Sequence, residues 1–340
     1  MVHRLCCGVK GEVKRGGDQL CRKWFRAASL ALCTALMSGA ASSEVLDKIF
    51  LNSTVLITYI VTAPAPASGD SSQGATTKPP QALGVMSGTG FLMFGEVGIS
   101  KAKVYLVTNR HILPPEGQPK DIQLRLVVRQ NDGATKIEEI SVPIVGGDGK
   151  YLPSVHLHRD PATDVAAVNI AITAFGSRFQ SLIEAIQTGK YLNSSMLLPT
   201  QKMSSEGIGV GSQVYILGYP AAIFDPRNVS PVLRVGVIST DPQEGFNFNQ
   251  ELRRTMNFPE HINGFLLDAN IYPGSSGSLV VLATENCGCN KGPGQRPYIL
   301  GIVSGSIPIF DASLHAYSRI ALGMVYSADT IKEVLDSFSH

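Results

Sequence analysis

The sequence predicts an all-β protein, an antiparallel barrel or sandwich, and three observations support this. The 340 residues include 34 Gly and 20 Pro, and only 16% are charged, a composition that suits many short strands joined by turns. Short apolar runs of strand type recur along the chain. They do not alternate strictly with helices, so a parallel α/β sheet is not favoured. With 44% hydrophobic residues, a chain of this length can bury a sizeable core.

The elements follow in order. A short helix is expected over 44–50 and a strand over 53–61, and then a flexible loop over 63–82, which is rich in Pro, Ala, Ser, Gly and Thr. An Asn-Asp-Gly turn at 131–133 predicts a hairpin. The strands expected after the loop are 88–94, 104–113, 122–130, 137–145, 164–170, 212–220, 231–240, 264–270, 277–283 and 298–306. A helix is expected over 177–189, inside an insertion at 171–195 of unassigned role, and an amphipathic helix over 330–338.

The first 41 residues have the pattern of an export leader, which leaves 44–340 as the folded domain. Seven basic and two acidic residues give residues 1–40 a net charge of +5. An apolar stretch follows from Ala27 to Met37, and then small residues where cleavage after Ala40 or Ala41 is expected. The stretch is shorter than the roughly 20 residues of a membrane-spanning helix. We therefore expect an exported protein, periplasmic or secreted, with no stable membrane span after leader removal. An uncleaved N-terminus, or a true start downstream of Met1, is the alternative.

The remaining chain gives no sign of nucleic-acid, metal or cofactor binding. The whole chain carries +2, so the part beyond the leader carries −3 and does not favour a nucleic-acid partner. Cys287 and Cys289 are the only cysteines there, and we expect two loop thiols or a loose local bridge. His156, His158 and Asp160 offer metal-ligand types, but a solvated surface loop is the simpler interpretation.

The candidate catalytic residues lie in three short stretches: TNRHIL contains His111, ATDVAAV contains Asp164, and YPGSSGS contains Ser276. A serine hydroxyl becomes a nucleophile when a base takes its proton, and a histidine base needs a carboxylate to hold its tautomer. The backbone N–H groups of Gly274 and Ser276 can point together at a developing oxyanion. The three residues therefore predict a catalytic triad with an oxyanion hole.

These stretches resemble the catalytic blocks of the trypsin-like serine peptidases, in the chain order His, Asp, Ser, and are most similar to the HtrA/Deg type. Matching pieces also flank them, among them GTGFLM, VYILGYP, VGVIS and LGIVSG, so the resemblance covers roughly residues 45–338. It implies two six-stranded antiparallel β-barrels, with a helical insertion and a C-terminal helix. It also implies a serine endopeptidase that acts on polypeptides without a cofactor. No PDZ domain is expected within 44–340, and the oligomeric state is left open.

The resemblance also implies a substrate pocket. Ser304 would hydrogen-bond Asp164, Gly305 and Ser306 would line the primary pocket, Asn270 would lie at its floor, and Tyr272 would shape its rim. A neutral floor and small walls predict cleavage after small aliphatic residues, because a Lys or Arg side chain would be buried without a carboxylate partner. Asp268, two residues before Asn270, is expected to be structural.

Two departures from the family pattern leave an alternative open. Ser275 stands where the family has Asn or Asp, and Ser278 stands where it has a second glycine. A catalytically silent trypsin-like binding module is therefore the rival interpretation. An α/β-hydrolase esterase is not favoured, since it requires the reverse chain order, Ser before Asp before His.

Overall fold

We describe the protein from a computed structural model. The structure describes residues 46, 48–62, 82–95, 103–118, 120–129, 135–170, 191–227, 229–256, 258–283, 297–311 and 316–339. The expected leader, the helix at 177–189, the loop with Cys287 and Cys289, and nearly all of the loop at 63–82 lie outside these residues. Asp47–His340 forms one compact unit, and the account below concerns that unit.

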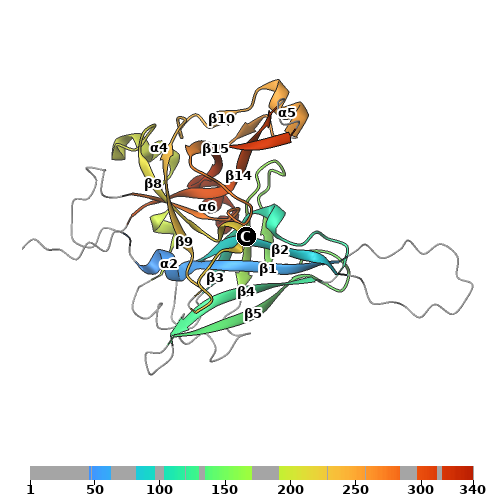
Figure 1. Cartoon of the computed structure of the whole chain (residues 1–340). Helices are drawn as coiled ribbons and strands as arrows, with labels where there is room; N and C mark the ends of the chain where they lie inside the picture. The colour runs from blue at the N-terminus through green and yellow to red at the C-terminus, as the bar shows by residue number, and fades with distance from the viewer. Residues whose placement is uncertain are drawn as a thin grey trace, which may run out of the picture. The chain divides into compact units, whose positions relative to one another are not determined.

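The first half of this unit is a curled, seven-stranded antiparallel sheet (Figure 1). Its strands are β1 (Thr54–Thr62), β2 (Ala82–Phe94), β3 (Val104–Thr108), β4 (Lys120–Arg129), β5 (Thr135–Val145), β6 (Val155–Leu157) and β7 (Ala166–Ile170), in the order β5-β4-β1-β2-β3-β7-β6. Its core is built from β-branched and leucine side chains, such as Val55, Ile57 and Leu106, which suit a pleated, buried surface. Strand pairing among the described residues does not close this sheet.

The second half is a closed six-stranded antiparallel barrel. Its strands are β8 (Gln213–Gly218), β9 (Val232–Ile238), β12 (Gly264–Asp268), β13 (Leu279–Leu282), β14 (Ile299–Asp311) and β15 (Ala316–Ser327), in the order β12-β15-β14-β13-β8-β9. Alternate residues point inward, as Phe265 and Leu267 of β12 show by joining the second core cluster. The predicted trypsin-like double barrel is thereby confirmed, but the first half has seven strands where six were expected, and it is a curled half-barrel and not a closed one.

Helices and short strands connect these sheets. The α-helices are α2 (Lys48–Ser53), α4 (Thr200–Met203), α5 (Gln250–Met256) and α6 (Ala328–Asp336). The 3₁₀ turns are η1 (Arg110–Ile112), η4 (Ser194–Met196), η5 (Ser204–Glu206), η6 (Pro220–Ala222) and η8 (Ser337–Ser339), and β10 (Phe246–Asn247) pairs with β11 (His261–Ile262). The helix α6 buries Ile331 and Val334, as the predicted amphipathic closing helix should.

The structure corrects three of the sequence-based expectations. The expected strand 104–113 ends at Thr108, because the chain turns into η1 there, and this turn carries His111. The expected helix over 44–50 is α2, shifted to Lys48–Ser53, and the strand after it starts one residue later than expected. The strand β15 was missed, although it forms the longest strand pairing of the barrel with β14. Of the three differences, the missed β15 arises from strand pairing that the local pattern does not contain.

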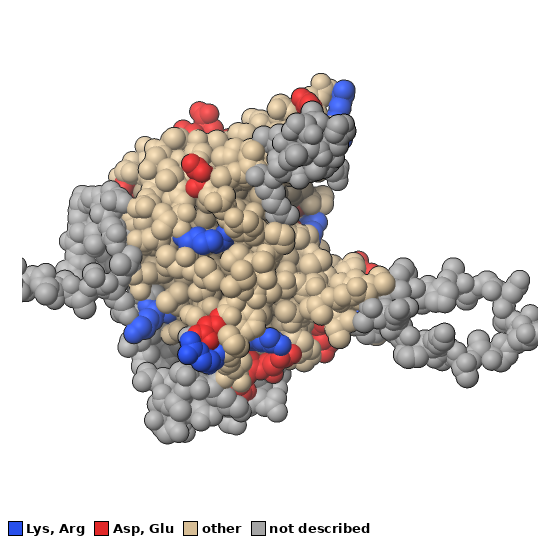
Figure 2. Space-filling model, viewed as in Figure 1, with Lys and Arg blue, Asp and Glu red and all other residues tan. Residues whose placement is uncertain are grey.

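The charged residues on the face seen in Figure 2 are scattered, with basic and acidic side chains interspersed. No basic patch gathers on that face among the described residues. A search of the described helices for one long and apolar enough to cross a bilayer finds none.

Candidate active site

His111 and Asp164 lie side by side at the end of the first sheet. His111 sits in η1 directly after β3, and Asp164 lies just before β7, which pairs with β3. The His111 Nδ1 atom lies 2.6 Å from Asp164 Oδ2, and the His111 backbone N–H donates to Asp164 Oδ1 at 3.0 Å. Both carboxylate oxygens therefore face the histidine, which fixes the ring orientation and leaves Nε2 pointing away from the carboxylate.

Two further groups hold Asp164. The Ser304 hydroxyl donates to Asp164 Oδ2 at 2.6 Å, and the Asn109 side-chain amide donates to the Asp164 carbonyl at 2.7 Å. Ser304 is buried and belongs to β14 of the second barrel. The carboxylate therefore bridges the two sheets, and charge-assisted contacts of this length are among the stronger hydrogen bonds.

Ser276 lies in the loop after β12 and contacts Ser304, the residue that also holds Asp164. Its hydroxyl donates to the Ser304 carbonyl at 2.7 Å. No hydrogen bond joins Ser276 Oγ to His111 in the structure as described, so the three predicted residues are gathered but the serine-to-histidine contact is not made. Such contacts are often long or poorly aligned without substrate and tighten only when substrate binds.

The loop around Ser276 leaves two N–H groups unused. The N–H groups of Ser275, Gly277 and Ser278 each donate to a backbone carbonyl, at 3.0, 2.8 and 2.9 Å. Those of Gly274 and Ser276 donate to no backbone acceptor within the described residues. Gly274 has φ +85°, and a Cβ there would lie 2.5 Å from the Tyr219 carbonyl oxygen, so only glycine fits. Two neighbouring free donors beside a serine hydroxyl can stabilise an oxyanion.

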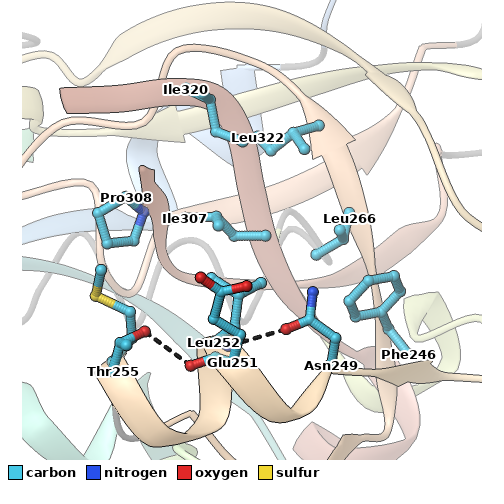
Figure 3. Close-up of a pocket in the computed structure, with 11 residues that line it drawn as sticks. Phe246, Asn249, Glu251, Leu252, Thr255, Leu266, Ile307, Pro308, Ile320 and Leu322 are labelled. Atoms are coloured by element: carbon cyan, nitrogen blue, oxygen red, sulfur yellow. Dashed lines mark hydrogen bonds between the residues drawn. The ribbon is translucent and has the colours of Figure 1, made fainter. Parts of the chain in front are cut away.

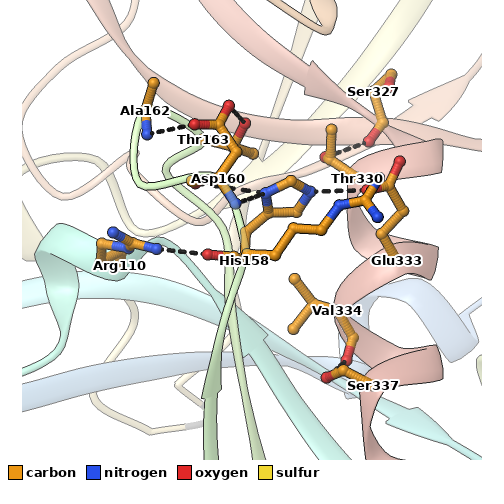
Figure 4. Close-up of polar contacts among 11 residues, drawn as sticks. Arg110, His158, Asp160, Ala162, Thr163, Ser327, Thr330, Glu333, Val334 and Ser337 are labelled. Atoms are coloured by element: carbon orange, nitrogen blue, oxygen red, sulfur yellow. Dashed lines mark hydrogen bonds and ion pairs between the residues drawn. The ribbon is translucent and has the colours of Figure 1, made fainter.

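The loop that delivers Asp164 is held by Arg110, as Figure 4 shows, and by a hydrogen bond from Tyr326. Arg110 donates to the carbonyls of His158 at 2.6 Å and Pro161 at 3.3 Å. The Tyr326 hydroxyl donates to the Ala162 carbonyl at 2.8 Å, and burial raises the pKa of Tyr326 to about 12, so it stays a donor. These contacts fix the chain just before the carboxylate.

The same loop is anchored to α6 through His158 (Figure 4). The Asp160 backbone N–H donates to His158 Nδ1 at 3.1 Å, so the Nε2–H faces Glu333 Oε2, also at 3.1 Å. The Ala162 N–H donates to the Asp160 carboxylate, and this contact lowers the pKa of Asp160. His156 instead stacks on Phe338, with ring centroids 3.7 Å apart. The described residues contain no group of three side chains suited to a metal ion.

The residues predicted to form the substrate pocket differ in exposure. Asn270 and Tyr272 are exposed, and Gly305 has open space where a Cβ would point. Ser306 pairs with Gly323 across β14 and β15. A Cβ on Gly323 would lie 2.6 Å from the buried side chain of Ile271, so Ile271 fills the space over that strand.

The sequence did not indicate that a buried arginine, Arg234, contacts Asn270. Arg234 of β9 points to the inner side of the barrel, since its cross-strand partner Ile216 lies in the core cluster. Arg234 Nη1 donates to the Asn270 carbonyl at 2.6 Å, while its Nε and Nη2 are buried without a partner within the described residues. Burial lowers the pKa of the guanidinium. Asp268, in contrast, is exposed and paired with the exposed Val237, so its side chain points out of the barrel.

The two residues that depart from the family pattern are both buried. The Ser275 hydroxyl accepts from the Tyr272 N–H at 3.3 Å. Ser278 lies against Gly218, where any added Cβ would overlap the Ser278 hydroxyl. The side chain that replaces the second glycine is thus accommodated by a glycine on the facing strand.

A cavity of about 630 Å³ lies apart from these residues (Figure 3). Helix α5 contributes Leu252 and Met256, and the barrel contributes Leu266, Ile307 and Leu322. None of the predicted site residues lines it, although Ile307, which follows Ser306 in the chain, is one of the lining residues. Its lining is mostly apolar, and its Thr255 hydroxyl donates to the Glu251 backbone carbonyl and not to a side-chain base, so it is not the candidate active site.

Comparison with known proteins agrees with the geometry. Residues 88–287 match a family model described as a trypsin-like peptidase domain. A search of curated proteins finds no match. Similar solved structures include an inactive form of the Rv3671c protease of M. tuberculosis, at 13% identity over 87% of this chain and 93% of that chain, with a TM-score of 0.42. Another is the thermostable serine protease AL20 from an extremophilic microorganism, at 11% identity over 84% and 97%, with a TM-score of 0.40. Both TM-scores are too low for either structure to indicate a property of this chain.

Proposed function

The chain belongs to the family of trypsin-like peptidase domains, and on this premise we propose that it is a serine endopeptidase that uses Ser276, His111 and Asp164. The single observation that carries the proposal is the contact of both Asp164 oxygens with His111, next to Ser276, whose own N–H and that of Gly274 have no backbone acceptor among the described residues. Family membership supports a polypeptide substrate. The closer likeness to HtrA/Deg peptidases rests on the sequence blocks alone and stays part of the proposal.

In the structure, the Ser304 carbonyl accepts a hydrogen bond from the Ser276 hydroxyl. In the proposed reaction, a backbone N–H of the substrate replaces that hydroxyl as the donor to the Ser304 carbonyl. The released Ser276 hydroxyl turns to His111 Nε2, which accepts its proton as Oγ attacks the scissile carbonyl carbon. The carbonyl π pair moves to oxygen, and the N–H groups of Gly274 and Ser276 stabilise that charge. The electron pair on the oxyanion then re-forms the carbonyl and the scissile C–N bond breaks, while His111, now an imidazolium held by Asp164, donates its proton to the leaving amine nitrogen. Water then hydrolyses the acyl-enzyme by the same steps.

The rival proposal is a catalytically silent binding module. It is favoured by one observation, that the Ser276 hydroxyl bonds the Ser304 carbonyl and not His111. The two proposals differ in one property, because only an enzyme forms a covalent adduct at Ser276. The buried fit of Ser278 against Gly218 removes one of the departures that favoured the silent module.

The proposed specificity is cleavage after small aliphatic residues. Asn270, Gly305 and Ser306 supply no negative charge, and Ile271 over Gly323 narrows the space beneath. The Arg234 guanidinium behind Asn270 adds repulsion against any Lys or Arg side chain. An apolar side chain entering this site gains about 25 cal/mol per Å² of surface removed from water.

We expect a proteome-derived peptide mixture to be cut mainly after Val, Ala, Leu or Ile, with cleavage sites mapped by mass spectrometry. The same mixture incubated with the Ser276→Ala variant should stay uncut. A dominant preference for Lys or Arg would contradict the proposal. A dominant preference for Asp or Glu would show that the Arg234 charge reaches the bound side chain, and Arg234→Leu should then remove that preference.

We also propose that the protein is exported and that its leader is removed near Ala40, on the basis of the basic, apolar and small-residue pattern of residues 1–41. Trp24 is the single tryptophan of the chain. The mature protein should therefore show no indole emission, and its intact mass should place the cleavage site. A mature chain that fluoresces as tryptophan would contradict the proposal.

A further inference from the structure

Thr89 belongs to the first sheet, but its hydroxyl and its backbone N–H bond residues in the loops that join strands of the second barrel. It lies in β2 and is fully buried. Its hydroxyl donates to the Gly274 carbonyl at 2.8 Å, and its backbone N–H donates to the Ser276 carbonyl at 2.8 Å. These are the two residues whose N–H groups form the candidate oxyanion hole. Thr89 therefore holds the carbonyl end of each hole residue.

The hydroxyl of Thr89 also holds the chain segment that faces Gly274. It accepts from the Tyr219 backbone N–H at 3.0 Å, so one hydroxyl bridges this segment and the Ser276 loop. The Tyr219 hydroxyl is itself buried and donates to the Val229 carbonyl at 2.8 Å. A buried hydroxyl that both donates and accepts leaves neither backbone group unsatisfied.

The segment after Tyr219 sets the direction of the first hole donor. The Ala221 N–H donates to the Pro273 carbonyl at 2.5 Å. That carbonyl and the Gly274 N–H belong to one planar peptide group, so holding the oxygen points the N–H to the opposite side. Ala221 and Ala222 have φ of 52° and 53°, a left-handed conformation that alanine adopts only where the surroundings impose it. The imposed conformation places the Ala221 N–H on the hole peptide.

Thr89 is also bonded to the strand that leads into His111. The Thr108 hydroxyl donates to the Thr89 carbonyl at 2.8 Å, and Thr108 ends the strand that leads into His111. The backbone of Gly277 lies so close to the Thr89 carbonyl that any Cβ there would overlap it. Thr89 is thus fixed by Thr108 of the first sheet, and it in turn holds the Gly274–Ser276 loop of the second barrel.

We propose that Thr89 is a positioning residue of the oxyanion hole, acting through its hydroxyl, which ties the Tyr219–Ala222 segment to Gly274. This inference rests on the proposed peptidase function and adds a residue to it. Because the hole is used only when charge develops on the substrate oxygen, loss of the hydroxyl should lower kcat and leave KM nearly unchanged.

The test compares Thr89→Val, which keeps the shape and removes the hydroxyl, with Thr89→Ser, which keeps the hydroxyl. A peptide boronic acid serves as the probe, since its tetrahedral adduct with Ser276 places an oxygen in the hole. We expect Thr89→Val to lose at least about tenfold in kcat and in boronate affinity together. KM and the affinity for the corresponding product peptide should stay within about twofold. Thr89→Ser should restore both losses.

Thr330→Val is the matched control. Thr330 is also fully buried, and its hydroxyl donates to the Ser327 carbonyl at 2.7 Å, in α6 and away from the hole. This variant should lower the melting temperature but leave kcat and boronate affinity unchanged. If Thr89→Val does not fold, Thr89→Cys replaces it, and its weaker S–H contact should give an intermediate loss.

The outcomes separate the inference from the proposed function. Wild-type kcat and boronate affinity in Thr89→Val would overturn the inference while the peptidase function stands. Equal losses in kcat, KM and product affinity would also overturn it, because they indicate general disruption. A wild-type protein that neither cuts peptides nor binds the boronate would overturn the function and the inference with it.

Discussion

Ser276→Ala should remove nearly all peptidase activity, by about a million-fold in kcat, because no other group in the site can form the acyl-enzyme. His111→Ala should cost about as much, since the serine hydroxyl then has no base. The double variant should lose little more than either single one, because the two residues act in a single step. The measurement is kcat for an amide substrate with each protein at equal concentration.

Two conservative changes serve as controls for that series. Ser278→Ala removes a buried hydroxyl that has no partner within the described residues, so activity should be retained. His261→Gln changes a histidine whose ring hydrogen-bonds Asn247 and Asn263 and none of the predicted site residues, and activity should again be retained. Losses that multiply in the Ser276 and His111 double variant would contradict the triad.

Asp164→Asn should lower kcat by about 10,000-fold while the fold is kept. The His111 backbone N–H requires an acceptor at the Oδ1 position, so the new side chain must place its carbonyl oxygen there. Its amide nitrogen then occupies the Oδ2 position and donates to His111 Nδ1. The proton of the ring is thereby moved to Nε2, which can no longer accept the proton of Ser276.

The control for this change is Asp268→Asn. Asp268 is an exposed acid at the end of β12, near the pocket in sequence but pointing out of the barrel. Its replacement should leave kcat unchanged. An Asp164→Asn variant with activity within about tenfold of wild type would show that the carboxylate does not set the tautomer of His111.

The parts of the fold that could be predicted are those with local signals. Strands such as Thr54–Thr62 and Leu279–Leu282 are apolar runs bounded by turn residues, and the closing helix has a clear amphipathic period. Helix α5 was missed because none of its residues is buried, so no periodic apolar pattern marks it. Strand β15 was missed because its pairing with β12 and β14, and not its own composition, makes it a strand.

The candidate site divides in the same way. His111, Asp164 and Ser276 could be predicted because each stands in a short block of defined spacing. The contact of Thr89 with Gly274 joins residues 185 positions apart in the chain, and no local pattern contains it. In the sequence, Arg234 is a single polar residue within an apolar strand. Only the closure of the barrel brings its guanidinium to the Asn270 carbonyl. The signal that could have found Thr89 is its position between two glycines in GTGF, where close backbone approach is expected.

Covalent labelling of Ser276 tests the central claim most directly. The purified protein would be treated with a fluorophosphonate probe, and the labelled residue would be identified by peptide mass spectrometry. We predict a single adduct on Ser276, absent from Ser276→Ala and strongly reduced in His111→Ala. Wild-type protein that stays unlabelled, while it is folded by its thermal transition, would contradict the proposed enzyme and favour the silent binding module.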